Sequence, residues 1–250
     1  MRHRAAVLTL GAFFFRWRSY LPLLVLPMIW FAIVGSQHPF ASHVDDLIWE
    51  AISVTVALLG QAIRVWTVGV AAPGTSGRIT RRQKAAVLNT TGPYSVVRHP
   101  LYVGNTLIAL GLAMFPHTWI APPLVTLVAA GYYACIAARE DEYLRERFGA
   151  RFAAWASRVP AFVPNPLLYV RAERAFDPRA VLRREFYGVA VILIMPFLLD
   201  LLEDFLEDGR LTLDPVWTPA AVLGAVVFVV LRTLKKRSRR QRVDPKGRAC

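Results

Sequence analysis

The sequence is poor in cysteine and contains no cluster of metal ligands. Its two cysteines are Cys135, inside an apolar segment, and Cys250, the last residue. No Cys-x-x-Cys pair and no cysteine–histidine spacing of a metal site occurs, so we predict neither a disulfide framework nor a metal centre. Cys250 also lacks the three following residues that a prenylation signal requires.

Acidic residues are few, and charged residues as a whole are scarce. Asp and Glu number 17 against 30 Lys and Arg, which gives a net charge of +13 with only 19% of residues charged. The mean hydropathy of +0.39 is higher than a soluble domain of this length would show. Because the basic residues alternate with long apolar segments, we predict a membrane protein and no nucleic-acid partner.

The apolar segments predict an all-α fold, a polytopic membrane helix bundle with about six transmembrane helices. The expected spans are residues 21–40, 47–70, 101–115, 119–138, 186–202 and 216–234. We expect two further helices, 5–15 and 140–157, to lie on the membrane surface, because the first is too short to cross and the second has one apolar and one charged face. The N-terminal segment lacks a convincing cleavage site, so we predict that it is retained.

The organisation is that of a single membrane domain, residues 1–250. Within it, 1–58 form the N-terminal helices, 59–166 the core, and 167–250 a two-helix extension with a basic tail. The basic segments are the N-terminus, the 71–91 loop, the 139–184 segment and the tail, whereas the other turns hold little besides acids and histidine. By the positive-inside rule both termini are cytoplasmic.

The stretch from Gly92 to Gly104 carries the densest chemistry. Arg98, His99 and two tyrosines stand immediately before an apolar run, and polar groups beside a membrane-length segment usually mark a site. One apolar hairpin later come the adjacent acids Glu140 and Asp141. An out-and-back hairpin returns these acids to the membrane face that holds His99.

These residue types suit a zwitterionic, nucleotide-like ligand. Arginine and histidine donate hydrogen bonds to a carboxylate, and a glutamate binds an ammonium or a ribose hydroxyl. Tyr94 and Tyr102 offer ring faces for a sulfonium or an adenine. Simpler interpretations are that Glu140 only begins a helix and that Arg98 only contacts lipid phosphate. The basic 71–91 loop is either a connector or an anion-binding lid.

The run Arg98-His99-Pro100-Leu101-Tyr102-Val103-Gly104, preceded by Thr91-Gly92-Pro93-Tyr94 and followed by the Glu140-Asp141 pair, resembles a known family. It is similar to the isoprenylcysteine carboxyl methyltransferase and phospholipid methyltransferase superfamily. The resemblance covers roughly residues 59–164. It implies an integral membrane enzyme that uses S-adenosyl-L-methionine on a lipid or lipid-like acceptor.

The resemblance also implies roles for individual residues. The cofactor-binding positions it implies are Leu88, Tyr94, His99, Pro100, Leu101, Tyr102 and Glu140. For the reaction itself we single out Arg98 and Tyr102. Two positions depart from the family pattern: the second acid is Asp141 instead of the commoner glutamate, and the substrate arginine of the prenylcysteine enzymes is replaced by Ile136. The second departure argues against a prenylcysteine acceptor.

Two alternatives belong to other classes of protein. One is an NADPH-dependent membrane reductase of the sterol-reductase type, which has a related hairpin. The other is a non-catalytic membrane scaffold or transporter component. The sequence does not distinguish a carboxylate, phosphate or amine head group in the acceptor, although the basic 71–91 loop favours an anionic one.

Overall fold

The computed structural model describes residues 2–17, 43–73, 75 and 85–243. Within these ranges the regular structure is entirely helical, which confirms the predicted all-α class. The expected span 21–40 and part of the basic 71–91 loop, residue 74 and residues 76–84, lie outside the described residues. The chain divides into two compact units, Met1–Asp177 and Pro178–Cys250.

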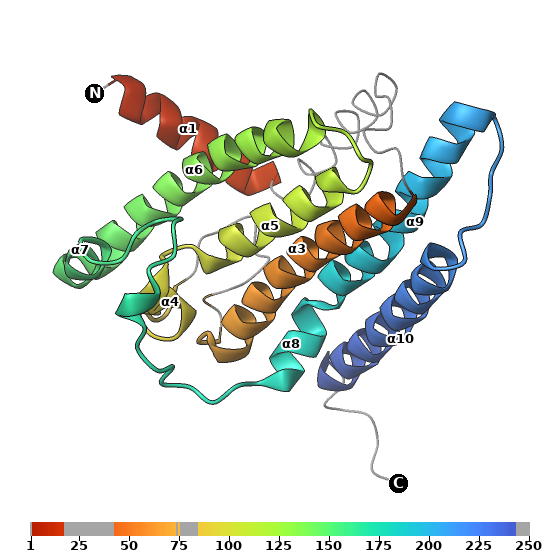
Figure 1. Ribbon diagram of the computed structural model, residues 1–250. Helices are drawn as coiled ribbons and strands as arrows, with labels where there is room; N and C mark the ends of the chain where they lie inside the picture. Colours follow the sequence, from red (N-terminus) through yellow and green to blue (C-terminus); the bar gives the residue numbers. More distant parts are fainter. Residues whose placement is uncertain (1, 18–42, 74, 76–84, 244–250) are drawn as a thin grey trace, which may run out of the picture. The chain divides into compact units, whose positions relative to one another are not determined.

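Four helices of the first unit pack side by side in the order α1, α6, α5, α3 (Figure 1). They are α1 (Arg2–Trp17), α6 (Ala121–Phe148), α5 (Pro100–Met114) and α3 (His43–Val70). The predicted surface segment 5–15 is therefore a helix, and in the structure it packs along α6. Its position in a membrane remains a prediction.

Small residues allow these helices to approach closely. A Cβ atom at Gly111 of α5 would come within 2.4 Å of the Ser53 carbonyl oxygen and 2.6 Å of the Ala57 nitrogen on α3. A Cβ atom at Gly11 of α1 would come within 2.3 Å of the Cys135 carbonyl oxygen on α6. Close backbone approach of this kind is typical of helices that pack in a membrane.

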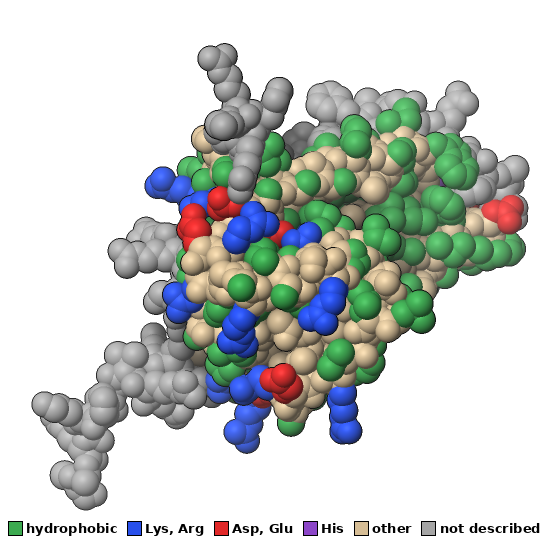
Figure 2. Space-filling view, turned by 90° about the vertical axis from the view of Figure 1, so that its left-hand side faces the viewer, with side chains coloured by type: hydrophobic (Ala, Val, Ile, Leu, Met, Phe, Trp, Pro, Cys, Tyr) green, Lys and Arg blue, Asp and Glu red, His purple; other side chains and the backbone are tan. Residues whose placement is uncertain are grey.

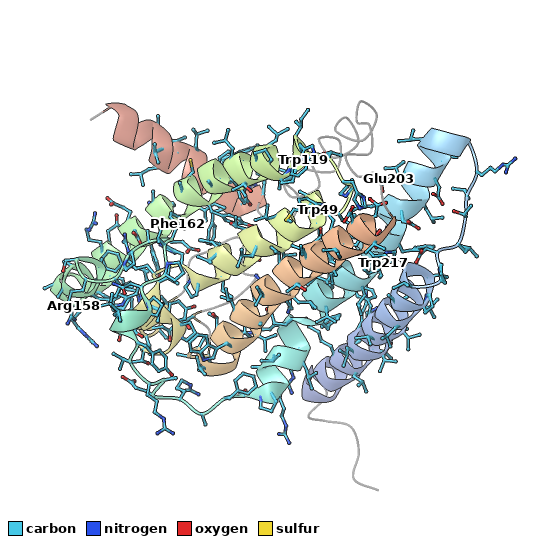
Figure 3. All side chains as sticks on the ribbon, viewed as in Figure 1. Trp49, Trp119, Arg158, Phe162, Glu203 and Trp217 are labelled. Atoms are coloured by element: carbon cyan, nitrogen blue, oxygen red, sulfur yellow. The ribbon has the colours of Figure 1, made fainter. Side chains whose placement is uncertain are left out.

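The turn between α5 and α6 contains Trp119, which lies beside Trp49 of α3. Figure 3 shows these two tryptophans at the opposite end of this unit from Phe162 and Arg158. Trp49 donates from Nε1 to the Met114 carbonyl oxygen at 2.7 Å, and its ring meets Trp119 edge-on at 5.4 Å. The predicted hairpin is therefore present. Two tryptophans at one end of a bundle are typical of a membrane interface.

Helix α6 corrects the prediction that a separate surface helix begins at Glu140. It runs without a break through both acids to Phe148, because its two prolines lie in the first turn, where proline is tolerated, and no proline follows before that point. Gly149, with a φ of 53°, ends it, and the short helix α7 (Ala150–Ala156) follows. The amphipathic pattern of residues 140–157 is thus divided between the end of α6 and α7.

The segment after α7 returns to the Gly92–His99 stretch, which contains the short helix α4 (Pro93–Val96). The Asn165 amide donates to the Val96 carbonyl at 3.0 Å, and the Gly92 amide donates to the Val170 carbonyl at 2.8 Å. A single 3-10 turn, η2 (Pro166–Leu168), interrupts this otherwise extended segment. The predicted extended segment therefore forms backbone hydrogen bonds with the Gly92–His99 stretch.

The second unit consists of α8 (Pro178–Arg184), α9 (Phe186–Asp208) and α10 (Trp217–Val243). The acidic residues expected in an outer loop after 202 instead extend α9, which ends where Gly209 adopts a φ of 64°. Helices α9 and α10 pack against each other, and a Cβ atom at Gly224 would come within 2.8 Å of the Leu193 side chain.

Three helices among the described residues are long and apolar enough to cross a membrane, and they lie in α3, α6 and α10. Helix α5 is shorter: 15 residues extend about 22 Å, less than the roughly 30 Å of a bilayer core. The protein is therefore a helical membrane protein. The count of six spans remains a prediction.

Candidate functional site

The site begins where the long helix α6 passes the start of the short helix α5. The two helices run antiparallel from a tight turn, so the end of α6 extends beyond the first residue of α5. Glu140 and Asp141 lie on α6 at this level. The Tyr102 hydroxyl, in the first turn of α5, donates to Oε1 of Glu140 at 2.6 Å.

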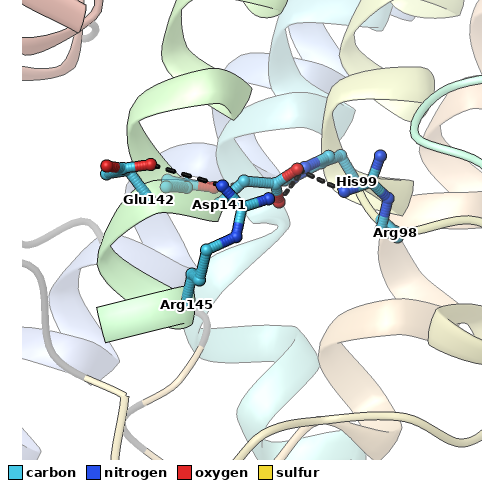
Figure 4. Close-up of polar contacts among 6 residues, drawn as sticks. Arg98, His99, Asp141, Glu142 and Arg145 are labelled. Atoms are coloured by element: carbon cyan, nitrogen blue, oxygen red, sulfur yellow. Dashed lines mark hydrogen bonds and ion pairs between the residues drawn. The ribbon is translucent and has the colours of Figure 1, made fainter. Parts of the chain in front are cut away.

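Asp141 is the acid that joins the two basic residues of the motif (Figure 4). Arg98 donates from Nη1 to Oδ2 of Asp141 and forms an ion pair with it. Nε2 of His99 lies 3.1 Å from Oδ1 of the same carboxylate, while its Nδ1 lies 3.7 Å from Oε2 of Glu140. The imidazole therefore contacts both acids.

Burial alone would lower the pKa of His99, because its side chain is only 5% exposed. Hydrogen bonds with Asp141 and Glu140 and the negative charges of both acids outweigh that effect. The pKa of His99 is therefore raised above its ordinary value of 6.5. The geometry favours an imidazolium held between two carboxylates.

Aromatic rings continue from His99 into the helix pair. The His99 and Tyr102 rings are stacked at 5.5 Å, and Tyr102 stacks in turn on Tyr133 of α6 at 4.9 Å. Phe162, from the extended segment after α7, lies 5.7 Å from the imidazole. The stack presents ring faces and hydroxyl groups beside the acids.

The backbone holds the two basic residues in place. The Arg98 amide donates to the Pro160 carbonyl at 2.8 Å, and the His99 amide donates to the Ala161 carbonyl at 3.2 Å. Pro100 is the first residue of α5, where its fixed φ and missing N–H are favourable. The motif is thus fixed on one side by the returning segment and on the other by α5.

The other predicted cofactor residues lie in different surroundings. Leu88 is buried in a hydrophobic cluster with Phe152 and Trp155, against which Tyr94 packs, and the Trp155 indole donates to the Tyr94 carbonyl at 3.2 Å. Pro100 is buried and Leu101 half-buried at the start of α5. The structure therefore joins Arg98, His99, Tyr102 and Glu140 directly, whereas Leu88 and Tyr94 belong to the neighbouring apolar cluster.

Sequence reasoning assigned no role to three residues that complete this cluster. Asp141 was predicted to lie near His99 as one of the acidic pair and was noted as a departure from the family pattern, but it was given no role of its own, although it contacts both Arg98 and His99. Tyr133 stands seven residues before Glu140, two helical turns away on the same face, and this spacing was a usable signal. Phe162 lies in an extended segment and had no such signal.

Glu142 provides a contrast within the same acidic run. Its carboxylate lies 3.5 Å from Nη1 of Arg145, and Figure 4 shows it directed away from His99. A helical step of two residues rotates a side chain by about 200°. The third acid of the run therefore pairs with Arg145 of its own helix.

Comparison of the chain with known proteins identifies a family whose model covers this site. Residues 50–151, which include Arg98, His99, Tyr102 and both acids, match the phospholipid methyltransferase family model. The nickel-cobalt-cadmium resistance protein NccN of Alcaligenes xylosoxydans xylosoxydans is 32% identical over 176 residues, covering 69% of this chain and 76% of that protein. No solved structure matches the chain.

Two further relatives match over shorter lengths. The cobalt-zinc-cadmium resistance protein CzcN of Cupriavidus metallidurans is 40% identical over 87 residues, which are 35% of this chain and 40% of that protein. The protein-S-isoprenylcysteine O-methyltransferase of Schizosaccharomyces pombe is 33% identical over 85 residues, 34% of this chain and 36% of that protein. The matched family model and these relatives show that the chain belongs to the isoprenylcysteine carboxyl methyltransferase and phospholipid methyltransferase superfamily of membrane methyltransferases.

Proposed function

We propose that the protein transfers a methyl group from S-adenosyl-L-methionine to a lipid or lipid-like acceptor in the membrane. The observation that supports this most strongly is the cluster of Arg98, His99 and Tyr102 with Glu140 and Asp141 at one end of an apolar helix pair. Such a cluster lies where a water-soluble cofactor and a membrane-embedded acceptor can meet.

The residues present fit the cofactor in charge and in donor type. Nε of Arg98 is buried and makes no hydrogen bond to any described residue, so it is available to a ligand carboxylate. Glu140, whose side chain is 26% exposed, suits an ammonium or ribose hydroxyl. The stacked rings of Tyr102 and Tyr133 provide faces for a cationic sulfur centre.

The bound cofactor supplies a methyl group that is already activated. The protein's share is therefore orientation and the exclusion of water. In this proposal Arg98 and Glu140 bind the two charged ends of the cofactor, while His99 fixes the two acids relative to the start of α5. Tyr102, bonded to Glu140, lies between these groups and the apolar helix pair and orients the reacting centre.

The chemistry of the acceptor decides whether a base is needed. A carboxylate or phosphate oxygen attacks with its own lone pair and has no proton to lose. A protonated amine must first give up a proton, and the nearby groups able to take one are Glu140, Asp141 and neutral His99. Because those groups are already engaged with one another, the arrangement suits an anionic acceptor better.

The six-span arrangement with cytoplasmic termini remains part of the proposal. The α7 end of the first unit carries the exposed arginines Arg145, Arg147, Arg151 and Arg158, and Figure 2, which looks onto this end, shows Lys and Arg side chains over the surface. Basic residues favour the cytoplasmic side of a membrane. We therefore place the cofactor site on that side.

The relatives with metal-resistance names motivate a second proposal about the setting of the reaction. NccN matches over most of its length, and that protein is named for nickel, cobalt and cadmium resistance. The described residues contain no group of three or more His, Cys, Asp or Glu suited to a metal ion. We propose that methylation of a membrane component, rather than metal binding by this unit, contributes to metal tolerance.

The direct test is to incubate purified protein with labelled S-adenosylmethionine and total membrane lipid. We expect label to enter the lipid fraction, and we expect Glu140→Ala to reduce its incorporation. Label that stays in the aqueous phase with wild-type protein would contradict the proposal. Binding of NADPH, but not of S-adenosylhomocysteine, would instead support a reductase.

A further inference from the structure

Arg64 is a charged residue inside a helix that is long and apolar enough to cross a membrane. It lies on α3, six residues before Val70, and so about 9 Å from that end of the helix. Charged side chains within membrane spans are costly and are usually found where a ligand or ion is handled. The mechanism proposed above does not use this residue.

The aliphatic part of the Arg64 side chain lies against α5 at Gly104. A Cβ atom at Gly104 would come within 2.7 Å of Cγ of Arg64 and equally close to the Gly60 carbonyl oxygen. Nη1 of Arg64 donates a hydrogen bond to Oδ1 of Asn105. The close approach of α3 and α5 therefore places the guanidinium at the second turn of α5.

This position is continuous with the site. Asn105 follows Tyr102 by three residues, so the two side chains share one side of α5. Tyr133 stacks on Tyr102 and also forms a side-chain hydrogen bond with Asn105. Side-chain contacts through Asn105 and Tyr133 thus connect Arg64 to Tyr102. The hydroxyl of Tyr102 in turn contacts Glu140.

The other helices around this path carry no positive charge at the same depth. Helix α5 contains no Lys or Arg, and α6 contains none before Arg139. The α6 residue one turn before Glu140 is Ile136, which is completely buried. Among the described helices that line this part of the unit, α3 is therefore the source of a cation, through Arg64.

We propose that Arg64, positioned by Asn105 and Tyr133, binds the anionic head group of the methyl acceptor. A guanidinium forms paired hydrogen bonds with a carboxylate or a phosphate, and it does so more specifically than an ammonium. An anion held there lies inside the apolar helix pair and next to Tyr102, where its hydrocarbon tail can remain in the membrane. This inference rests on the proposed function and assigns its acceptor to the class of anionic lipids.

The test is calorimetric titration of the full chain, in neutral detergent, with two single-chain probes. Dodecanoate carries a carboxylate, and dodecyl phosphate carries a phosphate, so the two titrations distinguish the head groups. We expect the wild-type protein to bind at least one probe and Arg64→Gln to weaken that binding about tenfold or more, the effect of losing a charged hydrogen bond. Arg151→Gln removes an exposed arginine of α7 and should leave binding unchanged.

Titration with S-adenosylhomocysteine in the same samples separates this inference from the proposed function. Arg64→Gln should keep wild-type affinity for S-adenosylhomocysteine, because Tyr102 lies between Arg64 and the two acids that are proposed to bind the cofactor. If Arg64→Gln does not fold, Arg64→Lys decides, and it should retain cofactor affinity with weaker anion binding. Wild-type binding of both probes by the substituted protein, or no binding of either by wild type, would overturn the inference. Absence of S-adenosylhomocysteine binding by wild type would instead contradict the proposed function.

Discussion

Nε2 of His99 lies 3.1 Å from Oδ1 of Asp141, although 42 residues separate them in the chain. The contact exists because α6 extends beyond the first residue of α5 and because α5 begins at Pro100, directly after the histidine. The same carboxylate binds Arg98 through its other oxygen. Asp141 therefore connects the basic motif to α6, whereas Glu140, bonded to Tyr102, is the more exposed acid.

We predict that Asp141→Asn destabilises the protein by about 1–3 kcal/mol, because Arg98 and His99 then share a neutral, weaker acceptor. The expected result is a lower melting temperature in detergent than that of wild type. Glu142→Gln is the matched change at the acid that pairs with the exposed Arg145, and it should cost less than Asp141→Asn. Equal melting temperatures for Asp141→Asn and wild type would show that the ion pair contributes nothing to the fold.

The raised pKa of His99 predicts a pH dependence with a definite sign. A group whose pKa is higher in the folded state stabilises the fold fully below its unfolded value, here 6.5, and this stabilisation is lost as pH rises through the folded value. We expect the difference in melting temperature between wild type and His99→Gln to be largest near pH 6 and to shrink toward pH 9. A difference that grows with pH would mean that the imidazole is held in its neutral form.

The close contact of α3 and α5 predicts opposite effects for two glycine substitutions. Gly111→Ala places a methyl group against the α3 backbone at Ser53 and Ala57, where nothing can move aside without separating the helices. We expect a loss of about 1–3 kcal/mol, typical of overpacking. Gly131→Ala, on α6 with nothing within 4 Å, should be neutral or stabilising by up to about 1 kcal/mol. Thermal unfolding of the two variants tests this, and equal destabilisation would contradict the packing described here.

The sequence was sufficient to predict the hairpin and the meeting of His99 with the acids. Apolar segment lengths and the tight turn determine both, and these are local properties of the chain. It was not sufficient to show which acid contacts the histidine, because that depends on the rotation of α6 relative to α5. Expecting a helix start at Glu140 was wrong for a related reason: an acid can begin a helix, but nothing before it ended the preceding one.

Other features depend on contacts between distant segments. The carbonyls of Pro160 and Ala161 that receive the Arg98 and His99 amides come from a segment about 60 residues later. The residue pattern of that segment does not indicate that its carbonyls accept these amides. Leu88 and Tyr94, which the family resemblance indicated as cofactor-binding, pack in the structure with α7, and their role remains a prediction.

The predicted topology places His117, in the turn between α5 and α6, outside the cell. Its turn carries no basic residue, whereas the opposite end of the unit is rich in arginine. Because His117 itself is buried, the position to label is the exposed Ile120 of the same turn. A cysteine introduced at position 120 should react with a membrane-impermeant reagent added from outside, and the control is a cysteine at position 151. Labelling of position 120 only from the cytoplasmic side would contradict the predicted orientation.

We propose that the cluster joining the start of α5 to the acids of α6 binds S-adenosylmethionine. Calorimetric titration of S-adenosylhomocysteine in detergent tests it directly, with His99→Ala, Glu140→Ala and, as a control, Glu142→Ala at the acid directed away from His99. Glu140→Ala removes a charged contact to the cofactor of roughly 1.5–3 kcal/mol, and His99→Ala removes the group that holds both acids in position. Affinity should therefore fall about tenfold to a hundredfold in each variant while the protein stays folded. Wild-type affinity in both His99→Ala and Glu140→Ala, or a larger loss in Glu142→Ala than in Glu140→Ala, would contradict the assigned site.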